Sequence, residues 1–149
     1  MTKFFVTCWI CIAGIAILSA GSALADTKSG AITLKSYDSP DDTPVTAQLG
    51  DKLKVTCKFF IQNFFGTKVI AAQAWVENTG QDPMMFSYNV AFFDADHNLI
   101  GTAGQSNFRA AIKPGEKSQM GPIVFIPPEL ISKVTSYQVT WYETTADHF

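Results

Sequence analysis

Cysteine, histidine and arginine are scarce in this chain of 149 residues, and each scarcity excludes a class of chemistry. There are three cysteines and two histidines, and Arg109 is the single arginine. Two of the cysteines lie in an apolar N-terminal stretch, so an exported domain would keep Cys57 alone and form no intramolecular disulfide. Because His97 and His148 are far apart in sequence, no metal cluster is expected, and no cofactor is predicted.

Charge and catalytic motifs are equally sparse. The net charge of −2 gives no electrostatic basis for binding nucleic acid or an anionic membrane. No glycine-rich phosphate loop and no Gly-x-Ser-x-Gly sequence occurs, and the paired carboxylates Asp41 and Asp42 lie in a turn-rich segment. Cys57 lies on the same face of its expected strand as the apolar residues Val55 and Phe59, so its thiol is expected to be buried in the core. The sequence therefore predicts no catalytic residues and a protein that is not an enzyme.

The N-terminal residues resemble a signal peptide. Lys3 supplies a positive charge, Phe4–Leu18 is an apolar run, and Ala23-Leu24-Ala25 offers small residues for cleavage before Asp26. The apolar run is shorter than the ~20 residues that a membrane span needs, which disfavours an uncleaved anchor. We therefore expect a signal peptide at residues 1–25, a single domain at residues 26–149, no membrane span after cleavage, and a periplasmic or extracellular location.

Short segments of alternating polarity, separated by turn residues, predict an all-β domain: a sandwich of about seven antiparallel strands of immunoglobulin-like type. The expected strands are Ala31–Tyr37, Asp51–Gln62, Thr67–Asn78, Phe86–Asp94, Leu99–Phe108, Lys117–Ile126 and Val134–Thr144. One helical turn is expected at Pro128–Ile131, because proline is favoured at a helix start.

The second and third of these strands are expected to form a hairpin through a turn at Asn63–Gly66. Pairing residues whose numbers sum to 129 would place Phe59 opposite Ile70 and Cys57 opposite Ala72. Both apolar faces would then lie on the same side, as a register must arrange. Any odd sum does the same, and immunoglobulin-type topologies often place two such strands in different sheets, so the register stays open here.

The middle of the chain resembles the FxLYD-type family of small bacterial exported β-sandwich modules. The matching segments are Val76–Gly80, Val90–Asp96, Leu99–Gly101 and Ile112–Glu116. The family's central tripeptide is replaced here by Ala91-Phe92-Phe93. The resemblance implies an immunoglobulin-like fold and a binding or accessory role, because such modules share a structure while serving different partners.

Several aromatic residues lie among the polar residues on the expected outer face of a strand, or at a turn. Packing of the core gives no reason for aromatic side chains at these positions. An apolar patch that binds a protein, glycan or lipid partner would account for them, and another exported or envelope protein is the expected partner. The alternative is that a loop, a helical turn or the second sheet covers them. The candidate partner-binding residues are Phe60, Phe64, Phe65, Trp75 and Phe93.

Three other interpretations stay open. The first is a carrier that holds a small apolar ligand between the sheets, which would need a cavity of about 300 Å³ or more. The second is weak calcium binding by Asp94, Asp96 and Asn98, whose spacing resembles the start of an EF-hand loop; a structural turn explains the same residues. The third is self-association into a homo-oligomer.

Overall fold

The computed structural model describes residues 24–37, 44–107 and 110–145, and these residues form nine strands and one short helix. In chain order they are β1 (Leu24–Ala31), β2 (Val45–Leu49), β3 (Leu53–Phe64), β4 (Thr67–Asn78), β5 (Met84–Phe93), β6 (Leu99–Ser106), β7 (Lys117–Met120), β8 (Ile123–Val124), α1 (Pro128–Ile131) and β9 (Ser136–Thr145). The helical turn expected at Pro128–Ile131 is confirmed as α1.

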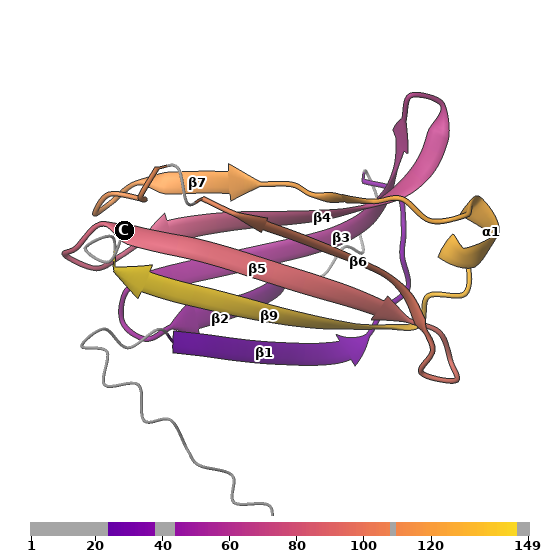
Figure 1. Ribbon diagram of the computed structural model, residues 1–149, viewed down its shortest axis with the longest axis horizontal. Helices are drawn as coiled ribbons and strands as arrows, with labels where there is room; N and C mark the ends of the chain where they lie inside the picture. Colours follow the sequence, from indigo (N-terminus) through magenta and orange to yellow (C-terminus); the bar gives the residue numbers. More distant parts are fainter. Residues whose placement is uncertain (1–23, 38–43, 108–109, 146–149) are drawn as a thin grey trace, which may run out of the picture.

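Antiparallel pairing joins the strands into two sheets. Sheet A has the order β1-β9-β5-β6, and sheet B has the order β2-β3-β4-β7, with β8 also paired to β4. The sheets lie face to face as two layers (Figure 1). The predicted β-sandwich is confirmed, with nine strands in the described part of the chain rather than about seven.

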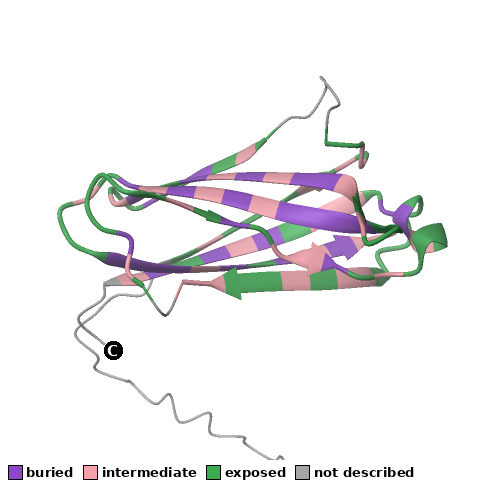
Figure 2. Ribbon diagram, turned by 90° about the horizontal axis from the view of Figure 1, so that it is seen from above, coloured by how far each residue is buried: buried purple, intermediate pink, exposed green. Residues whose placement is uncertain are grey.

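The core lies between the two inner faces, and strand alternation builds it. In β3, Leu53, Val55, Cys57 and Phe59 are buried, whereas the residues between them are exposed or half-buried. Figure 2 shows the same alternation of buried and accessible residues along other strands. Sheet A contributes the largest fully buried side chains, Trp141 among them.

The β3–β4 hairpin lies wholly within sheet B, so the two strands are not split between sheets. Its register differs by two residues from the suggested one: Phe59 lies opposite Ala72, and Cys57 opposite Ala74. The cause is the turn, which uses two residues rather than four and lets Phe64 pair with Thr67. A shift of two keeps every side chain on its face, so the predicted facing is correct.

The strand expected at Ala31–Tyr37 is wrong in position. Strand β1 ends at Ala31, and the segment that follows crosses from one sheet to the other. The Ile32 amide donates to the Thr135 carbonyl next to sheet A, and the Lys35 carbonyl accepts from the Ile61 amide in sheet B. Because its hydrogen bonds go to two sheets, the segment forms no ladder of its own. The prediction also omits β2.

Two other boundaries differ from expectation. The strand expected at Lys117–Ile126 is divided into β7 and β8 at Gly121-Pro122, since proline has no amide to donate. At the other end of the domain, the predicted cleavage point falls inside β1, where Leu24 and Ala25 pair with β9. The rest of the expected leader lies outside the described residues.

Candidate functional site: an aromatic hairpin tip

The β3–β4 hairpin ends in a two-residue turn formed by Phe65 and Gly66, and it rises clear of the sandwich (Figure 1). The φ angles of these residues are 47° and 82°, as a type I′ turn requires. Gly66 adopts such angles easily, whereas a bulky residue such as Phe65 rarely does. Phe65 is also 95% exposed. The turn therefore presents a large apolar side chain where Asn or Gly would fold more easily.

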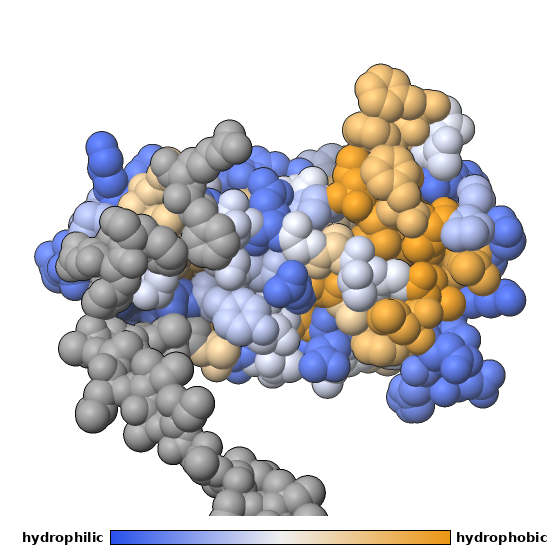
Figure 3. All heavy atoms as spheres, in the orientation of Figure 1, coloured by the Kyte–Doolittle hydropathy of each residue, from blue (hydrophilic) through white to orange (hydrophobic). Residues whose placement is uncertain are grey.

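Two further aromatic rings accompany Phe65. The ring centroids of Phe64 and Phe65 are 4.6 Å apart, and those of Phe64 and Phe125 are 5.7 Å apart, both with edge-to-face geometry. Phe125 follows β8 and is 66% exposed. We call Phe64, Phe65 and Phe125 the aromatic tip. Figure 3 shows hydrophobic side chains gathered at the end of the molecule from which the hairpin rises.

Phe60, a candidate for the same surface, is buried instead. It is 3% exposed, and its ring lies edge-on to that of Tyr37, with centroids 4.9 Å apart. Tyr37 belongs to the segment between β1 and β2. Phe60 is therefore covered by a loop, as the alternative interpretation expected, and is not part of an exposed patch.

The remaining two candidates lie away from the tip. Trp75 is half-buried in the middle of β4, opposite Thr56 and Gln119 on the outer face of sheet B. Phe93 is half-buried at the end of β5 in sheet A. Of the five predicted residues, the structure thus brings together only Phe64 and Phe65.

Phe125 was not among the candidates, because it lies inside the segment predicted as one continuous strand. The signal was present in the sequence: Ile123–Ile126 is apolar on both parities. A strand with one solvent-facing side does not need this pattern.

A cavity of about 350 Å³ lies where β1 and β2 form the edges of the two sheets. Its apolar lining comes from Ile32, Val45, Phe59, Phe60 and Tyr137. The Phe59 and Tyr137 rings, one from each sheet, have centroids 5.1 Å apart. Burial raises the pKa of the Tyr137 hydroxyl, with a smaller contribution from Cys57. The cavity therefore has a largely aromatic floor and reaches the size that the carrier interpretation requires.

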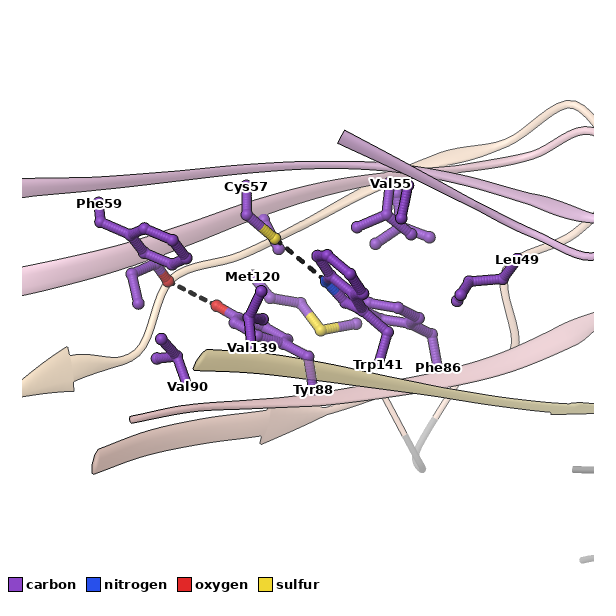
Figure 4. Close-up of a cluster of buried hydrophobic side chains, with 14 of the residues drawn as sticks. Leu49, Val55, Cys57, Phe59, Phe86, Tyr88, Val90, Met120, Val139 and Trp141 are labelled. Atoms are coloured by element: carbon purple, nitrogen blue, oxygen red, sulfur yellow. Dashed lines mark hydrogen bonds between the residues drawn. The ribbon is translucent and has the colours of Figure 1, made fainter. Parts of the chain in front are cut away.

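The core contains two polar contacts that serve the fold (Figure 4). The Trp141 Nε1–H donates to the Cys57 Sγ, 3.2 Å away. The Tyr88 hydroxyl donates to the Ala72 carbonyl, 2.5 Å away. Burial raises the pKa of Cys57 to about 11, against a smaller lowering by the Trp141 hydrogen bond. Cys57 is thus held as a neutral thiol, unsuited to nucleophilic attack.

Glu143 is a buried carboxyl group in β9. Its Oε2 atom has no hydrogen-bond partner among the described residues, and burial raises its pKa, which Lys52 partly opposes. A single buried carboxyl is the kind of group that can act as an acid or base. The charged groups that act on Glu143 are Lys52, which lowers its pKa, and Asp51, which raises it.

The Asp94–Asn98 segment forms a turn stabilised by its own side chains. The Asp94 Oδ1 atom accepts hydrogen bonds from the Asp96 and Asn98 amides, and its Oδ2 accepts one from the Asn98 side chain. These bonds, chiefly those from Asn98, hold the pKa of Asp94 below its ordinary value. These hydrogen bonds give the side chains of Asp94 and Asn98, and the amide of Asp96, a structural role in the turn.

Within residues 24–37, 44–107 and 110–145, no group of three or more His, Cys, Asp or Glu side chains is arranged to hold a metal ion. No helix in the same ranges has the length and apolar character to cross a bilayer.

Comparison with known proteins gives no relative from which a role could be transferred. No protein-family model matches the chain, and no curated protein gives a significant match. The resemblance to FxLYD-type modules therefore stays a prediction.

Proposed function

We propose that this chain is a non-catalytic binding module whose aromatic tip docks into an apolar surface of a protein partner. The observation that carries the proposal is Phe65, which is 95% exposed at a left-handed turn position. Backbone strain of this kind persists where it serves a purpose. Asn or Gly at this position would give a more stable hairpin, so the phenylalanine is explained better by contact than by folding.

The arrangement of the tip also suits docking. Phe64 is half-buried and its ring contacts those of both Phe65 and Phe125, which are exposed and extend the apolar area. Clustered aromatic side chains on a rigid element are typical centres of protein interfaces, and burying one contributes about 2 kcal/mol or more. A two-stranded hairpin presents such rings with little loss of conformational entropy on binding.

We further propose that the partner is an exported or envelope protein and that this chain is itself exported. The support is the leader-like sequence of residues 1–25 and the single cysteine of the remaining chain, which is buried and unreactive. Cleavage before Asp26 would leave six residues of β1, Asp26–Ala31, to pair with β9. Sequencing the N-terminus of protein recovered from the exported fraction tests this, and a start at Asp26 is expected.

The docking proposal is tested by placing a photo-crosslinking amino acid at Phe65 in the producing cells. A matched control carries the same crosslinker at Tyr142, which is also exposed but lies in sheet A. We expect a discrete protein adduct from position 65 and none of the same mass from position 142. The absence of a protein adduct at position 65, a lipid adduct instead, or the same adduct from both positions would contradict the proposal.

The cavity between the sheet edges favours a second candidate function, the carriage of a small apolar ligand. It is large enough for a small ligand, and Phe59, Phe60 and Tyr137 give it an aromatic lining. Native mass spectrometry of freshly isolated protein should then show an added mass. Val45→Phe, which fills the cavity from β2, should remove that mass, whereas Thr46→Phe at the exposed neighbouring position of β2, which does not line the cavity, serves as the control.

A further inference from the structure

The outer face of sheet A has an unusual composition. Alternation along four paired strands gives the side chains that point away from the core. They are Ala25, Thr27, Ser29 and Ala31 from β1; Ser136, Gln138, Thr140, Tyr142 and Thr144 from β9; Met85, Ser87, Asn89, Ala91 and Phe93 from β5; and Leu99, Thr102, Gly104 and Ser106 from β6. None of these side chains carries a charge, and hydroxyl and amide groups predominate.

The outer face of sheet B differs sharply. There Lys54 pairs across the strands with Glu77, and Glu77 in turn pairs with Lys117, to which it forms an ion pair at 3.5 Å. Solubility is ordinarily secured by charges of this kind. The outer face of sheet A is therefore hydrophilic without charge, in a chain that carries charged residues on its other sheet.

Two depressions lie on this neutral face and share one side chain. The first, of about 540 Å³, is lined by Asn89, Ala91, Thr102, Gly104, Gln138 and Thr140. The second, of about 520 Å³, is lined by Ser29, Phe93, His97, Ser136 and Gln138, among others. Because Gln138 lines both, the two depressions adjoin near the start of β9. Each has a volume in the range of ordinary ligand sites.

The first depression is shaped by small residues. Gly104 lies opposite Asn89, and a Cβ atom at Gly104 would come within 2.1 Å of the Asn89 Oδ1. The absence of a side chain at Gly104 therefore lets the Asn89 amide lie over β6. Ala91, whose side chain also points outward, adds little height beside it. The first depression is therefore shallow, and the side-chain amide of Asn89 lies at its base.

We infer that this face binds a neutral saccharide chain, with Gln138 and Asn89 as hydrogen-bonding groups and Phe93 as an apolar contact. Sugar hydroxyls both donate and accept hydrogen bonds, and the side chains that match them are amides and hydroxyls, which do the same. A phenyl ring offers an apolar surface to the C–H groups of a sugar ring. This inference concerns a different sheet from the aromatic tip and does not rest on the docking proposal.

The same chemistry disfavours other occupants. Nucleic acids and anionic lipids need clusters of cationic side chains, whereas no Lys or Arg lines either depression and His97 is the single histidine among the lining residues. An added peptide strand binds along a sheet edge through backbone groups, whereas these depressions lie on the face over β5 and β9. A charged polysaccharide would find no counter-charge. A neutral, hydroxyl-rich chain is the ligand that the composition fits.

The inference is tested by isothermal titration calorimetry of the full exported chain with four soluble probes. Three are neutral, namely maltohexaose, cellohexaose and chitohexaose, and the fourth is the charged oligogalacturonate hexamer. We expect at least one neutral probe to bind and the charged probe not to bind. Gln138→Ala should weaken that binding by about 3- to 10-fold, the usual effect of losing a neutral hydrogen bond.

Matched variants locate the site. Gln119→Ala removes the same side chain from β7 in sheet B and should leave affinity unchanged, as should Phe65→Ala at the aromatic tip. Phe93→Ala should weaken binding by about 10-fold. Failure of all three neutral probes at millimolar concentration, equal binding of the charged probe, or equal losses for Gln119→Ala and Gln138→Ala would overturn the inference. Self-association that Gln138→Ala abolishes would overturn it as well, by showing that a second copy occupies the face.

Discussion

At the scale of single residues, polar contacts in the core show how the two sheets are held in register where the described residues include a single cysteine, Cys57. The indole N–H of Trp141 in sheet A donates to the Cys57 sulfur in sheet B, and the Tyr88 hydroxyl in sheet A donates to the Ala72 carbonyl in sheet B. A buried donor without an acceptor costs about 1–3 kcal/mol, so each contact penalises sliding of one sheet over the other.

The raised pKa of Cys57 has a consequence for stability. In the unfolded chain the thiol ionises near its ordinary pKa of 9.0, whereas in the folded chain it ionises near 11. Between these values only the unfolded state loses the proton, so the stabilising contribution is complete below pH 9 and is lost as pH rises toward 11. We predict that the free energy of unfolding falls between pH 8 and pH 10 by about 1 kcal/mol more in the parent chain than in Cys57→Ala.

Urea denaturation of both proteins at the two pH values measures this difference. Each must begin at Asp26, so that Cys57 is the only cysteine present. Equal losses in the parent and in Cys57→Ala would show that the thiol titrates as freely in the folded state as in the unfolded one.

Asn78 is the second residue with a well-defined structural role. It is fully buried at the end of β4, and its Nδ2 donates to the Asp82 and Ile112 carbonyls, both at 2.7 Å. Its Oδ1 accepts from the Gly80 amide at 2.9 Å. One side chain thus satisfies three backbone groups from the loops at this end of the sandwich.

We predict that Asn78→Ala lowers the free energy of unfolding by about 2–4 kcal/mol, because a fully buried side chain that makes three hydrogen bonds is removed. Asn89→Ala provides the control: the same residue type is removed from an exposed position on β5, and a change within about 0.5 kcal/mol is expected. Chemical denaturation of the two variants is the measurement, and similar losses in both would contradict the role assigned to Asn78.

At the scale of elements, strands with clear alternation and clear turns were predictable, and strands defined by tertiary pairing were not. The bounds of β4 at Thr67–Asn78 follow from an alternating pattern between two turns. Strand β2 has five residues, and its pairing with β3 defines it more than its own composition does. The segment after Ala31 alternates like a strand but divides its hydrogen bonds between two sheets. The alternation of polar and apolar residues does not show which sheet each backbone group will bond to.

The residues of the candidate site likewise fall into those that the sequence could predict and those that it could not. Phe64 and Phe65 were identifiable because a turn with two adjacent phenylalanines has no folding rationale. The burial of Phe60 was not foreseeable, since it depends on where Tyr37 lies. Nor was the place of Phe125 at the tip, which depends on the break at Pro122 and the pairing of β8 with β4. Side-chain parity is local information, whereas coverage by a distant segment is not.

The β3–β4 turn yields a prediction about stability. Phe65 has a φ angle of 47°, which Asn tolerates better than Phe. We predict that Phe65→Asn raises the free energy of unfolding by about 0.5–1 kcal/mol. Gly66→Ala is the opposite control, because alanine at a φ angle of 82° should lower it by about 1 kcal/mol. Loss of stability in Phe65→Asn would show that the ring serves the fold.

At the scale of the whole molecule, the sandwich presents three surfaces that differ in chemical composition. One end carries exposed aromatic rings, the β1–β2 edge opens into a cavity, and the outer face of sheet A is neutral and hydroxyl-rich. A rigid two-sheet scaffold suits this division, because each surface rests on strands that are fixed by the core.

The central claim is that Phe65 is exposed for contact with a partner. The most direct measurement places the photo-crosslinker at Phe125, beside the tip, and compares adduct yield with and without Phe65→Asn. We expect a chain that is more stable to urea yet yields at least about 10-fold less adduct, since one central aromatic side chain often dominates an interface. An undiminished adduct yield from the stabilised variant would contradict the account.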